Sequence, residues 1–208
     1  LLKVARAAGC PWDVAVAIDL ALAGCSEGLK WACSGEDRCP WNEEVCDLAA
    51  QSGDMELVLW LLTKGCPCSP RTMAAISNSP GLQGTTGPGP LMYLARGRGA
   101  PWDVSTSANL ARRGLITILK WAVNEGCPTG TETTAAAARG GRLDILRWLR
   151  GLGCFWSTTT CSEAARGGHL EVLEYARDNG CRWNPQTCAM AALGGHMHIL
   201  VWVRLNRC

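Results

Sequence analysis

Residues 126–206 read GCPTGTETTAAAARGGRLDILRWLRGL, GCFWSTTTCSEAARGGHLEVLEYARDN and GCRWNPQTCAMAALGGHMHILVWVRLN, which are three consecutive segments of 27 residues. Each segment holds an Ala-rich stretch, a Gly-Gly break and a second stretch with apolar residues at helical spacing. Self-similarity at a fixed period of roughly 20–50 residues is the sequence signature of a repeat architecture. The three segments therefore predict a protein built from copies of one short unit.

The turn that opens these segments recurs along the rest of the chain. Its Cys position falls at residues 10, 39, 66, 100, 127, 154, 181 and 208, and residue 100 is Ala. The steps are 29, 27, 34, 27, 27, 27 and 27 residues. We therefore expect a single array over residues 1–208, with units that begin near residues 10, 39, 66, 100, 127, 154 and 181. The third unit has an insertion at 79–90, whose Gly, Pro and Thr content predicts a flexible surface loop.

Each unit is expected to form a hairpin of two helices. Three residues after the turn position stands a residue of the helix N-cap class: Asp13, Asn42, Ser69, Asp103, Gly130, Ser157 and Asn184. Glycines such as Gly53, Gly114 and Gly168 then end the first helix, as left-handed C-caps do. Neither helix can bury its apolar stripe alone, so neighbouring units must stack. The fold class expected is an all-α solenoid of about seven helical hairpins.

The unit TCSEAARGGHLEVLEYARDNGC, at Thr160–Cys181, resembles an ankyrin repeat. The resemblance lies in its Ala-Ala pair, its Gly-His turn, its Leu-Glu-Val-Leu second helix and its closing Asn-Gly-Cys. The usual ankyrin unit has about 33 residues, so this array is similar to a short ankyrin variant in which Pro-Trp replaces the β-hairpin finger. The usual Thr-Pro-Leu-His opening is also absent. The resemblance covers essentially the whole chain, and it implies an ankyrin-like solenoid whose concave face binds other proteins.

Composition and motifs exclude several functional classes. Hydrophobic residues make up 48% of the chain and the net charge is +2, which suits a folded protein and is too balanced for a general polyanion binder. No run of eighteen apolar residues is present, so no membrane span is expected. No P-loop, nucleophile elbow or Ser-His-Asp set appears, and His169 and His196 share one turn position that a hydrogen bond would steady. We expect no enzyme, no cofactor and no small-molecule substrate.

The 13 cysteines are explained chiefly by the repeat. Seven occupy the turn position, and Cys46, Cys161 and Cys188 share a position on the first helix, so ten are expected to act as small buried hydrophobes. Equivalent positions of stacked units lie about 8–10 Å apart, which is too far for a disulfide. A metal or redox role is the second interpretation, because Cys66-x-Cys68 is a close pair, but no second pair or His follows at finger-like spacing.

The tryptophans form two ladders. Trp31, Trp60, Trp121, Trp148 and Trp202, with Tyr175, recur on the second helix and are expected to pack there. The other ladder recurs in the turn, where it either packs between units or forms an exposed aromatic strip that binds a partner. Phe155 replaces the Pro of other turns and widens such a strip. The candidate partner-binding residues are Trp12, Trp41, Trp102, Trp156, Trp183 and Phe155.

The function expected is a protein–protein interaction scaffold that holds a partner on the concave face. The alternative is a structural, RNA-contacting subunit of a large assembly, because arginines between residues 112 and 166 could track a nucleic-acid strand. Acids such as Glu132 and Glu163 sit among those arginines, and a solvated face explains both signs. Thirteen cysteines without a disulfide pattern favour a reducing intracellular compartment, first the cytoplasm. The chain opens without Met and neither end has a polar capping repeat, so we expect a segment of a longer array. Because a targeting segment can precede Leu1, location in an organelle is kept as an alternative to the cytoplasm.

Overall fold

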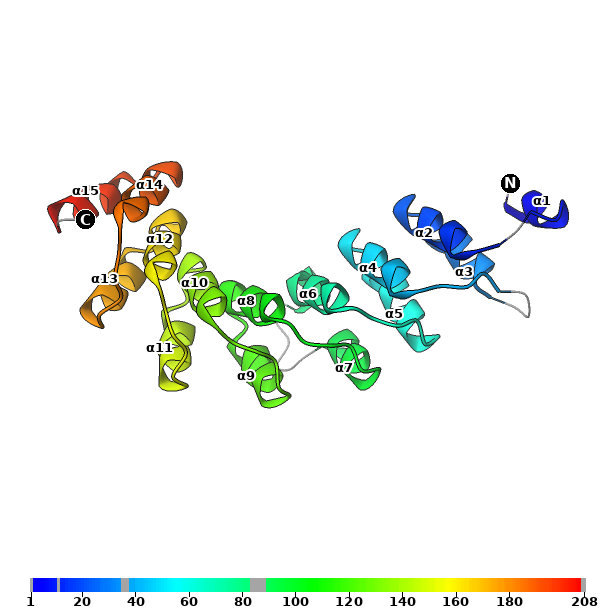
Figure 1. Ribbon diagram of the computed structural model, residues 1–208, viewed down its shortest axis with the longest axis horizontal. Coiled ribbons are helices and arrows are strands. Elements are labelled where there is room, and N and C mark those ends of the chain that lie inside the picture. The colour runs from blue at the N-terminus through cyan, green and yellow to red at the C-terminus, as the bar shows by residue number, and fades with distance from the viewer. Residues whose placement is uncertain (1, 11, 35–37, 83–88, 207–208) are drawn as a thin grey trace. The chain divides into compact units, whose positions relative to one another are not determined.

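The chain folds into paired helices that follow the predicted units (Figure 1). The computed structural model describes residues 2–10, 12–34, 38–82 and 89–206, and this part contains fifteen α-helices and no strand. The first helices are α2 (Val14–Leu22), α4 (Glu43–Gln51), α6 (Pro70–Asn78), α8 (Val104–Arg113), α10 (Thr131–Arg139), α12 (Thr158–Gly167) and α14 (Pro185–Leu193). The second helices are α1 (Leu2–Ala7), α3 (Ser26–Ala32), α5 (Met55–Thr63), α7 (Pro90–Gly97), α9 (Ile116–Asn124), α11 (Leu143–Gly151), α13 (Leu170–Asp178) and α15 (Met197–Leu205). The all-α helical-repeat class expected from the sequence is confirmed.

The insertion of the third unit lies between its two helices, as the sequence predicts. A 3₁₀ turn, η1 (Pro80–Leu82), follows α6 there, and residues 83–88 of the insertion lie outside the described part of the chain. By contacts the chain divides into two compact units. The first holds the described residues up to Pro101, and the second holds those from Trp102 onward. The single array expected over residues 1–208 stays a prediction.

The first helices begin at the N-caps that the sequence predicts. All seven cap residues have extended backbone, and six of them accept a hydrogen bond from an amide of the first turn through their side chains. Gly130 is the exception, because it has no side chain. There the Thr133 hydroxyl accepts a hydrogen bond from the Gly130 amide at 3.2 Å. The caps satisfy amides that a helix leaves without intrahelical partners, and they fix where each hairpin starts.

The two glycines of each Gly-Gly break have different physical roles. The second glycine is left-handed, with φ of 69° at Gly141 and 84° at Gly168, which only glycine adopts without strain. The first glycine has an ordinary φ but no room for a side chain. A Cβ on Gly194 would lie 2.5 Å from the Arg166 carbonyl oxygen of the preceding first helix. The first glycine therefore permits close approach between successive first helices.

In the second compact unit the first helices form the tight side of the stack. α8, α10, α12 and α14 pack directly against one another, whereas each second helix contacts chiefly the first helix of its own hairpin. Fully buried alanines, among them Ala137 and Ala164, make the close packing between first helices possible. Larger side chains such as Leu146 and Leu173 fill the space between first and second helices. Because the stack is tighter on the first-helix side, that side is the concave one.

The cysteines are all free thiols in the described part of the chain, and most are buried as expected. Buried turn thiols also donate to the N-cap carbonyl of the preceding hairpin, as Cys39 does to Asp13 at 3.0 Å and Cys181 does to Ser157 at 3.2 Å. Cys10 departs from the prediction and is exposed. Cys154 and Cys188 are half-buried.

A recurring buried threonine completes the contacts between first helices. Thr106, Thr133, Thr160 and Thr187 stand at the same position, three residues after the N-cap, and none is exposed. The Thr133 hydroxyl lies 2.9 Å from the Ser107 hydroxyl of the preceding helix. The Thr187 hydroxyl, by contrast, has no hydrogen-bond partner among the described residues. The preceding helix carries Cys161 where α8 carries Ser107, so the bond that secures Thr133 is not repeated at Thr187.

Replacing Thr187 by valine is expected to leave the free energy of unfolding unchanged or raise it by up to about 1 kcal/mol. Valine has the same shape, and it removes a buried hydroxyl that no described group satisfies. The matched control is Thr133→Val, expected to cost about 1–2 kcal/mol because the Gly130 amide loses its acceptor. Urea unfolding followed by circular dichroism measures both variants. Equal losses in the two would contradict this account of Thr187.

Candidate functional site

The turn tryptophans are half-buried, and each packs edge-on against an aromatic ring of the second helix of its own hairpin. The centroid separation is 5.6 Å for Trp12 and Trp31 and 5.7 Å for Trp183 and Trp202. The same geometry pairs Trp41 with Trp60, Trp102 with Trp121 and Trp156 with Tyr175. Edge-to-face pairs of this kind add about 0.5–1.5 kcal/mol beyond the area they bury. Each of the five turn tryptophans is therefore paired with a ring of the second-helix ladder. Trp148 of that ladder has Thr129 at its turn position and no turn ring to pair with.

An arginine of the preceding second helix lies over the ring of several turn tryptophans. The guanidinium of Arg150 lies 4.2 Å from the Trp156 ring centre, and that of Arg177 lies 4.0 Å from the Trp183 ring centre. Both guanidinium groups also donate to the backbone of the turn, to the Cys154 carbonyl at 2.8 Å and the Cys181 carbonyl at 2.7 Å. These turn tryptophans thus link successive hairpins through cation–π contacts.

Phe155 is the candidate that stands apart from the others. Its side chain is 78% exposed, whereas the five turn tryptophans are half-buried. Leu152, at 51% exposed, lies with it on the rim of a shallow hollow of about 400 Å³. Among the six candidate partner-binding residues, Phe155 therefore has the most exposed side chain. Binding of a partner by the six candidate residues stays a prediction.

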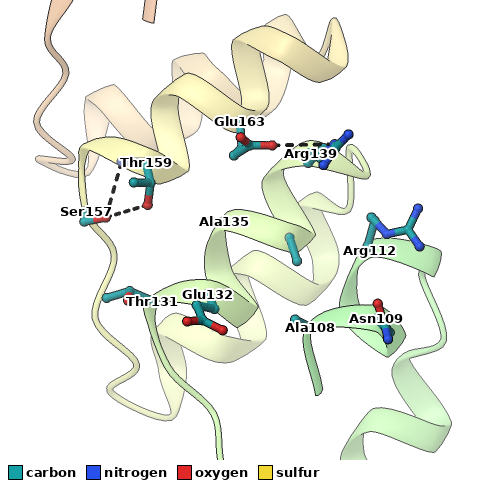
Figure 2. A pocket seen from close by; sticks show the side chains of 11 residues that line it. Ala108, Asn109, Arg112, Thr131, Glu132, Ala135, Arg139, Ser157, Thr159 and Glu163 are labelled. Carbon is teal, nitrogen blue, oxygen red and sulfur yellow. Dashed lines mark hydrogen bonds and ion pairs between the residues drawn. The ribbon is translucent and has the colours of Figure 1, made fainter. Parts of the chain in front are cut away.

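A larger hollow lies on the concave first-helix face of the second compact unit. It has a volume of about 480 Å³ and lies over α8, α10 and α12 (Figure 2). Its floor is made of the small residues Ala108, Ala135 and Ala136. We call it the α10 groove. Sequence reasoning missed it, because no single motif marks it.

The signal that could have found the α10 groove is the register of the first helices. Residues two, six and nine positions after the N-cap recur on this face. At position six, α8 carries Asn109, α12 carries Glu163 and α14 carries Met190, but α10 carries Ala136. One short side chain in a row of long ones leaves a hollow.

The charged residues of the α10 groove are separated along the helices. Arg112 and Arg139 line it at the last turns of α8 and α10, and Glu132 lines it at the first turn of α10 (Figure 2). Both positions are favourable, because the helix dipole stabilises cations at the C-terminus and anions at the N-terminus. Hydroxyls of Thr131, Ser157 and Thr159 line the same end as Glu132.

Glu163, on α12, forms ion pairs with Arg139 of the groove and with Arg166 of its own helix. Its carboxylate lies 3.5 Å from Arg139 Nε and 3.9 Å from Arg166 Nη1, and its side chain is 24% exposed. The Arg139 side chain remains 48% exposed, so the rest of its guanidinium faces solvent. Glu132 is exposed and makes no ion pair with any described residue. The groove can therefore offer a cationic group at one end and an anionic group at the other.

The histidines of the Gly-Gly-His turn link successive hairpins. His169 Nε2 donates to the Arg139 carbonyl and His196 Nε2 to the Arg166 carbonyl, each at 3.1 Å. The bond thus reaches the preceding first helix, 30 residues earlier. Burial lowers the pKa of His169, and the nearby charges of His196 and Arg142 lower it further, against the opposing effect of the carbonyl bond.

The stability that His169 contributes is expected to fall as the solution is acidified. The native pKa lies below the ordinary value of 6.5, so the unfolded chain binds the proton more readily than the native one. The contribution is complete above pH 6.5 and is lost as the pH falls through the native pKa. His169→Gln keeps a donor but does not titrate. The stability difference between wild type and this variant, measured by urea unfolding from about pH 5 to about pH 8, should therefore rise with pH. A flat difference would contradict the assignment.

The close cysteines around Cys46 and the buried Cys33 bear on the metal or redox interpretation. No group of three or more His, Cys, Asp or Glu side chains among them could hold a metal ion. Cys46 lies beside Cys66 and Cys68, and the contact with Cys66 together with burial raises the pKa of Cys46 to about 12. Burial also raises the pKa of Cys33 to about 12. Both thiols are therefore protonated at neutral pH, whereas a nucleophilic or metal-binding cysteine has to be a thiolate.

Among the described helices none is long and apolar enough to cross a membrane. No family model and no curated protein matches the sequence. Among solved structures, the chain is similar to the pentatricopeptide repeat protein PPR10 in complex with an 18-nt psaJ RNA element, with 14% identity over 94% of this chain and 34% of that chain and a TM-score of 0.47. It is also similar to PPR10 from maize, with 18% identity over 90% of this chain and 32% of that chain and a TM-score of 0.48. The chain spans about a third of the length of these proteins.

Proposed function

We propose that this chain is a non-catalytic protein–protein interaction scaffold that holds a polypeptide partner on the first-helix face. The observation that carries the proposal is the α10 groove, a hollow of about 480 Å³ with an alanine floor and charges of both signs. Its volume is in the range of about 300–1,000 Å³ that ligand sites occupy. Polar groups around a small-residue floor suit the backbone and side chains of another protein.

The groove is preformed by the same contacts that hold the hairpins together. The first glycines of the Gly-Gly breaks let α8, α10 and α12 approach closely, and buried threonines link them. A surface fixed in this way loses little conformational entropy when it binds, so more of the contact energy appears as affinity. This is the advantage that a stacked-hairpin scaffold gives to recognition.

The finer identity of the units belongs to the same proposal. We infer that they are short ankyrin-like repeats in which the finger is reduced to the Pro-Trp turn. Supporting features are the helical hairpin, the left-handed glycine at residues such as Gly168, and the His169 bond to the preceding hairpin. Free thiols at all twelve described cysteines support a reducing compartment, and we place the protein in the cytoplasm.

Contact with RNA is the alternative function, favoured by one observation. Arg112, Arg139 and Arg166 recur at the last turn of three successive first helices, with a period of 27 residues. A row of guanidinium groups suits phosphates. Glu163 lies within 4 Å of two members of the row, and Glu132 shares the groove. Carboxylates at these positions oppose a polyanion, so the protein partner is the better proposal.

Photo-crosslinking in the native extract tests the two functions against each other. A photoreactive amino acid replaces Thr131, which lines the groove, and in a matched variant it replaces Thr117, an exposed residue of α9 on the other side of the hairpin. We expect one defined protein to crosslink at position 131 but not at 117, with or without nuclease. A partner that disappears with nuclease would favour RNA. Protein crosslinks confined to position 117 would overturn the groove as the binding surface.

A further inference from the structure

The partner of the α10 groove has to match a fixed pattern of charge. Glu132 and Arg139 are seven residues apart on α10, so they lie on one face of the helix, about 10.5 Å apart along its axis at 1.5 Å per residue. Both line the groove, and the alanine at position 136 between them adds no polar group. The groove therefore presents an anionic point and a cationic point at a set separation.

The cationic point holds two arginines and one carboxylate. Arg112 lines the same end from α8 and Glu163 lies beside Arg139, so this end keeps one net positive charge. Arg139 is held by Glu163 through Nε at 3.5 Å, while nearly half of its side chain is exposed. A guanidinium has five N–H donors in a planar fork, so one ion pair leaves donors for a carboxylate of a ligand.

The anionic point is Glu132, whose side chain is exposed and has no cationic partner among the described residues. Hydroxyls of Thr131, Ser157 and Thr159 lie at the same end, and two of them, Ser157 and Thr159, are 2.7 Å apart. A carboxylate among hydroxyls suits an ammonium or guanidinium group together with a nearby backbone amide.

We propose that the α10 groove binds an extended polypeptide segment that carries an acidic and a basic side chain three residues apart. The acid would face Arg112 and Arg139, and the base would face Glu132. In the polyproline II conformation, which has three residues per turn and rises about 3.1 Å per residue, side chains three residues apart point to the same side and lie about 9 Å apart. This spacing is close to the separation along α10. The alanine floor lets the backbone of the segment approach the helix. This inference rests on the proposed scaffold function and adds the chemistry of its partner.

Charge balance favours this occupant over a nucleic acid. The charged residues of the groove are two arginines and two glutamates, Arg112, Arg139, Glu132 and Glu163. A nucleic-acid backbone that extended along the groove from Arg112 and Arg139 would bring a phosphate close to Glu132, and the two negative charges would repel each other. A segment with both signs meets an opposite charge at each end, which is the complementarity that gives interfaces their specificity.

Labelled peptides that differ only in charge pattern test the inference. The probes are acetylated octapeptides centred on Glu-Ser-Pro-Lys, Glu-Ser-Pro-Glu or Lys-Ser-Pro-Lys, in which proline keeps the chain extended, and a ten-residue oligouridine. Fluorescence anisotropy with the full chain measures each affinity. We expect the Glu-Ser-Pro-Lys peptide to bind at least about tenfold more tightly than either like-charged peptide and than the oligouridine.

Two variants make the test independent of loss of folding. Glu132→Lys should reverse the preference, losing about tenfold for Glu-Ser-Pro-Lys and gaining a similar factor for Glu-Ser-Pro-Glu, a gain that no unfolded protein would show. Ala136→Met should weaken every peptide by filling the groove. The equivalent residue of α14 is Met190, so a methionine is compatible with this helix position.

The outcomes separate this inference from the proposed function. Equal affinities for the three peptides, or an unchanged preference in Glu132→Lys, would overturn the charge pattern. If a protein still crosslinks at position 131 in the native extract, the scaffold function stands without it. Tighter binding of the oligouridine than of any peptide would overturn both and favour RNA.

Discussion

Alanine at Gly140 is expected to destabilise the second compact unit by about 3 kcal/mol. A Cβ on Gly140 would lie far inside van der Waals contact with the Arg112 carbonyl oxygen. The obstructing atom belongs to the backbone of α8, so it cannot turn aside as a flexible side chain would. α8 and α10 would have to separate, and overpacking of this kind costs about 1–3 kcal/mol and occasionally more.

Gly151→Ala is the matched control for this prediction. Gly151 ends α11 and has no positive φ, and a Cβ added to it would have no neighbouring atom within 4 Å. Alanine there is expected to be neutral or to stabilise by up to about 0.5 kcal/mol, because it is the better helix former. Chemical unfolding of both variants gives the comparison. If Gly140→Ala and Gly151→Ala unfold at the same denaturant concentration, close approach of the first helices is not what the glycine provides.

Removing the turn tryptophan at position 156 is expected to cost about 2 kcal/mol. Replacing a fully buried large aromatic by alanine costs about 3–5 kcal/mol, and Trp156 is half-buried, so a smaller loss is expected. The variant would lose the contact with Tyr175 at 6.2 Å and the contact with Arg150 at 4.2 Å. Thermal unfolding followed by circular dichroism measures the effect.

The neighbouring residue supplies the control for Trp156. Phe155 is 78% exposed, and Phe155→Ala is expected to change the free energy of unfolding by no more than about 0.5 kcal/mol. The Thr134 hydroxyl bonds to the Phe155 carbonyl at 3.2 Å, and alanine keeps that carbonyl. If Trp156→Ala left stability unchanged and weakened partner binding, the turn row would be a binding strip and not a link between hairpins.

The sequence was sufficient for the features that depend on local chemistry. The 27-residue period, the N-caps from Asp13 to Asn184 and the left-handed glycines follow from residue type at fixed positions. Each of these depends on the backbone of a few consecutive residues. Because the units repeat, the helix boundaries assigned in one hairpin also apply to the others. The helices and the position of the insertion could therefore be predicted without coordinates.

The contacts between hairpins could not be read in the same way. The sequence marks Gly140 and Gly141 alike, yet one is required by contact with Arg112 and the other by its own φ of 69°. It shows Trp156 in the turn ladder, and only the folded turn after α11 brings the Arg150 guanidinium over its ring. The turn thiols were expected to be apolar filling, but Cys181 also donates to the Ser157 carbonyl.

The α10 groove shows why tertiary structure decides the site. Ala136 is one more alanine in an Ala-rich helix as far as the sequence is concerned. It opens a hollow because Asn109 and Glu163 stand beside it on neighbouring helices, which are 27 residues away in either direction. The sequence by itself determined the repeat, its helices and their ends, because these depend on short-range backbone preferences. Which side chains meet across the stack depends on how closely successive helices approach, and only the folded chain settles that distance.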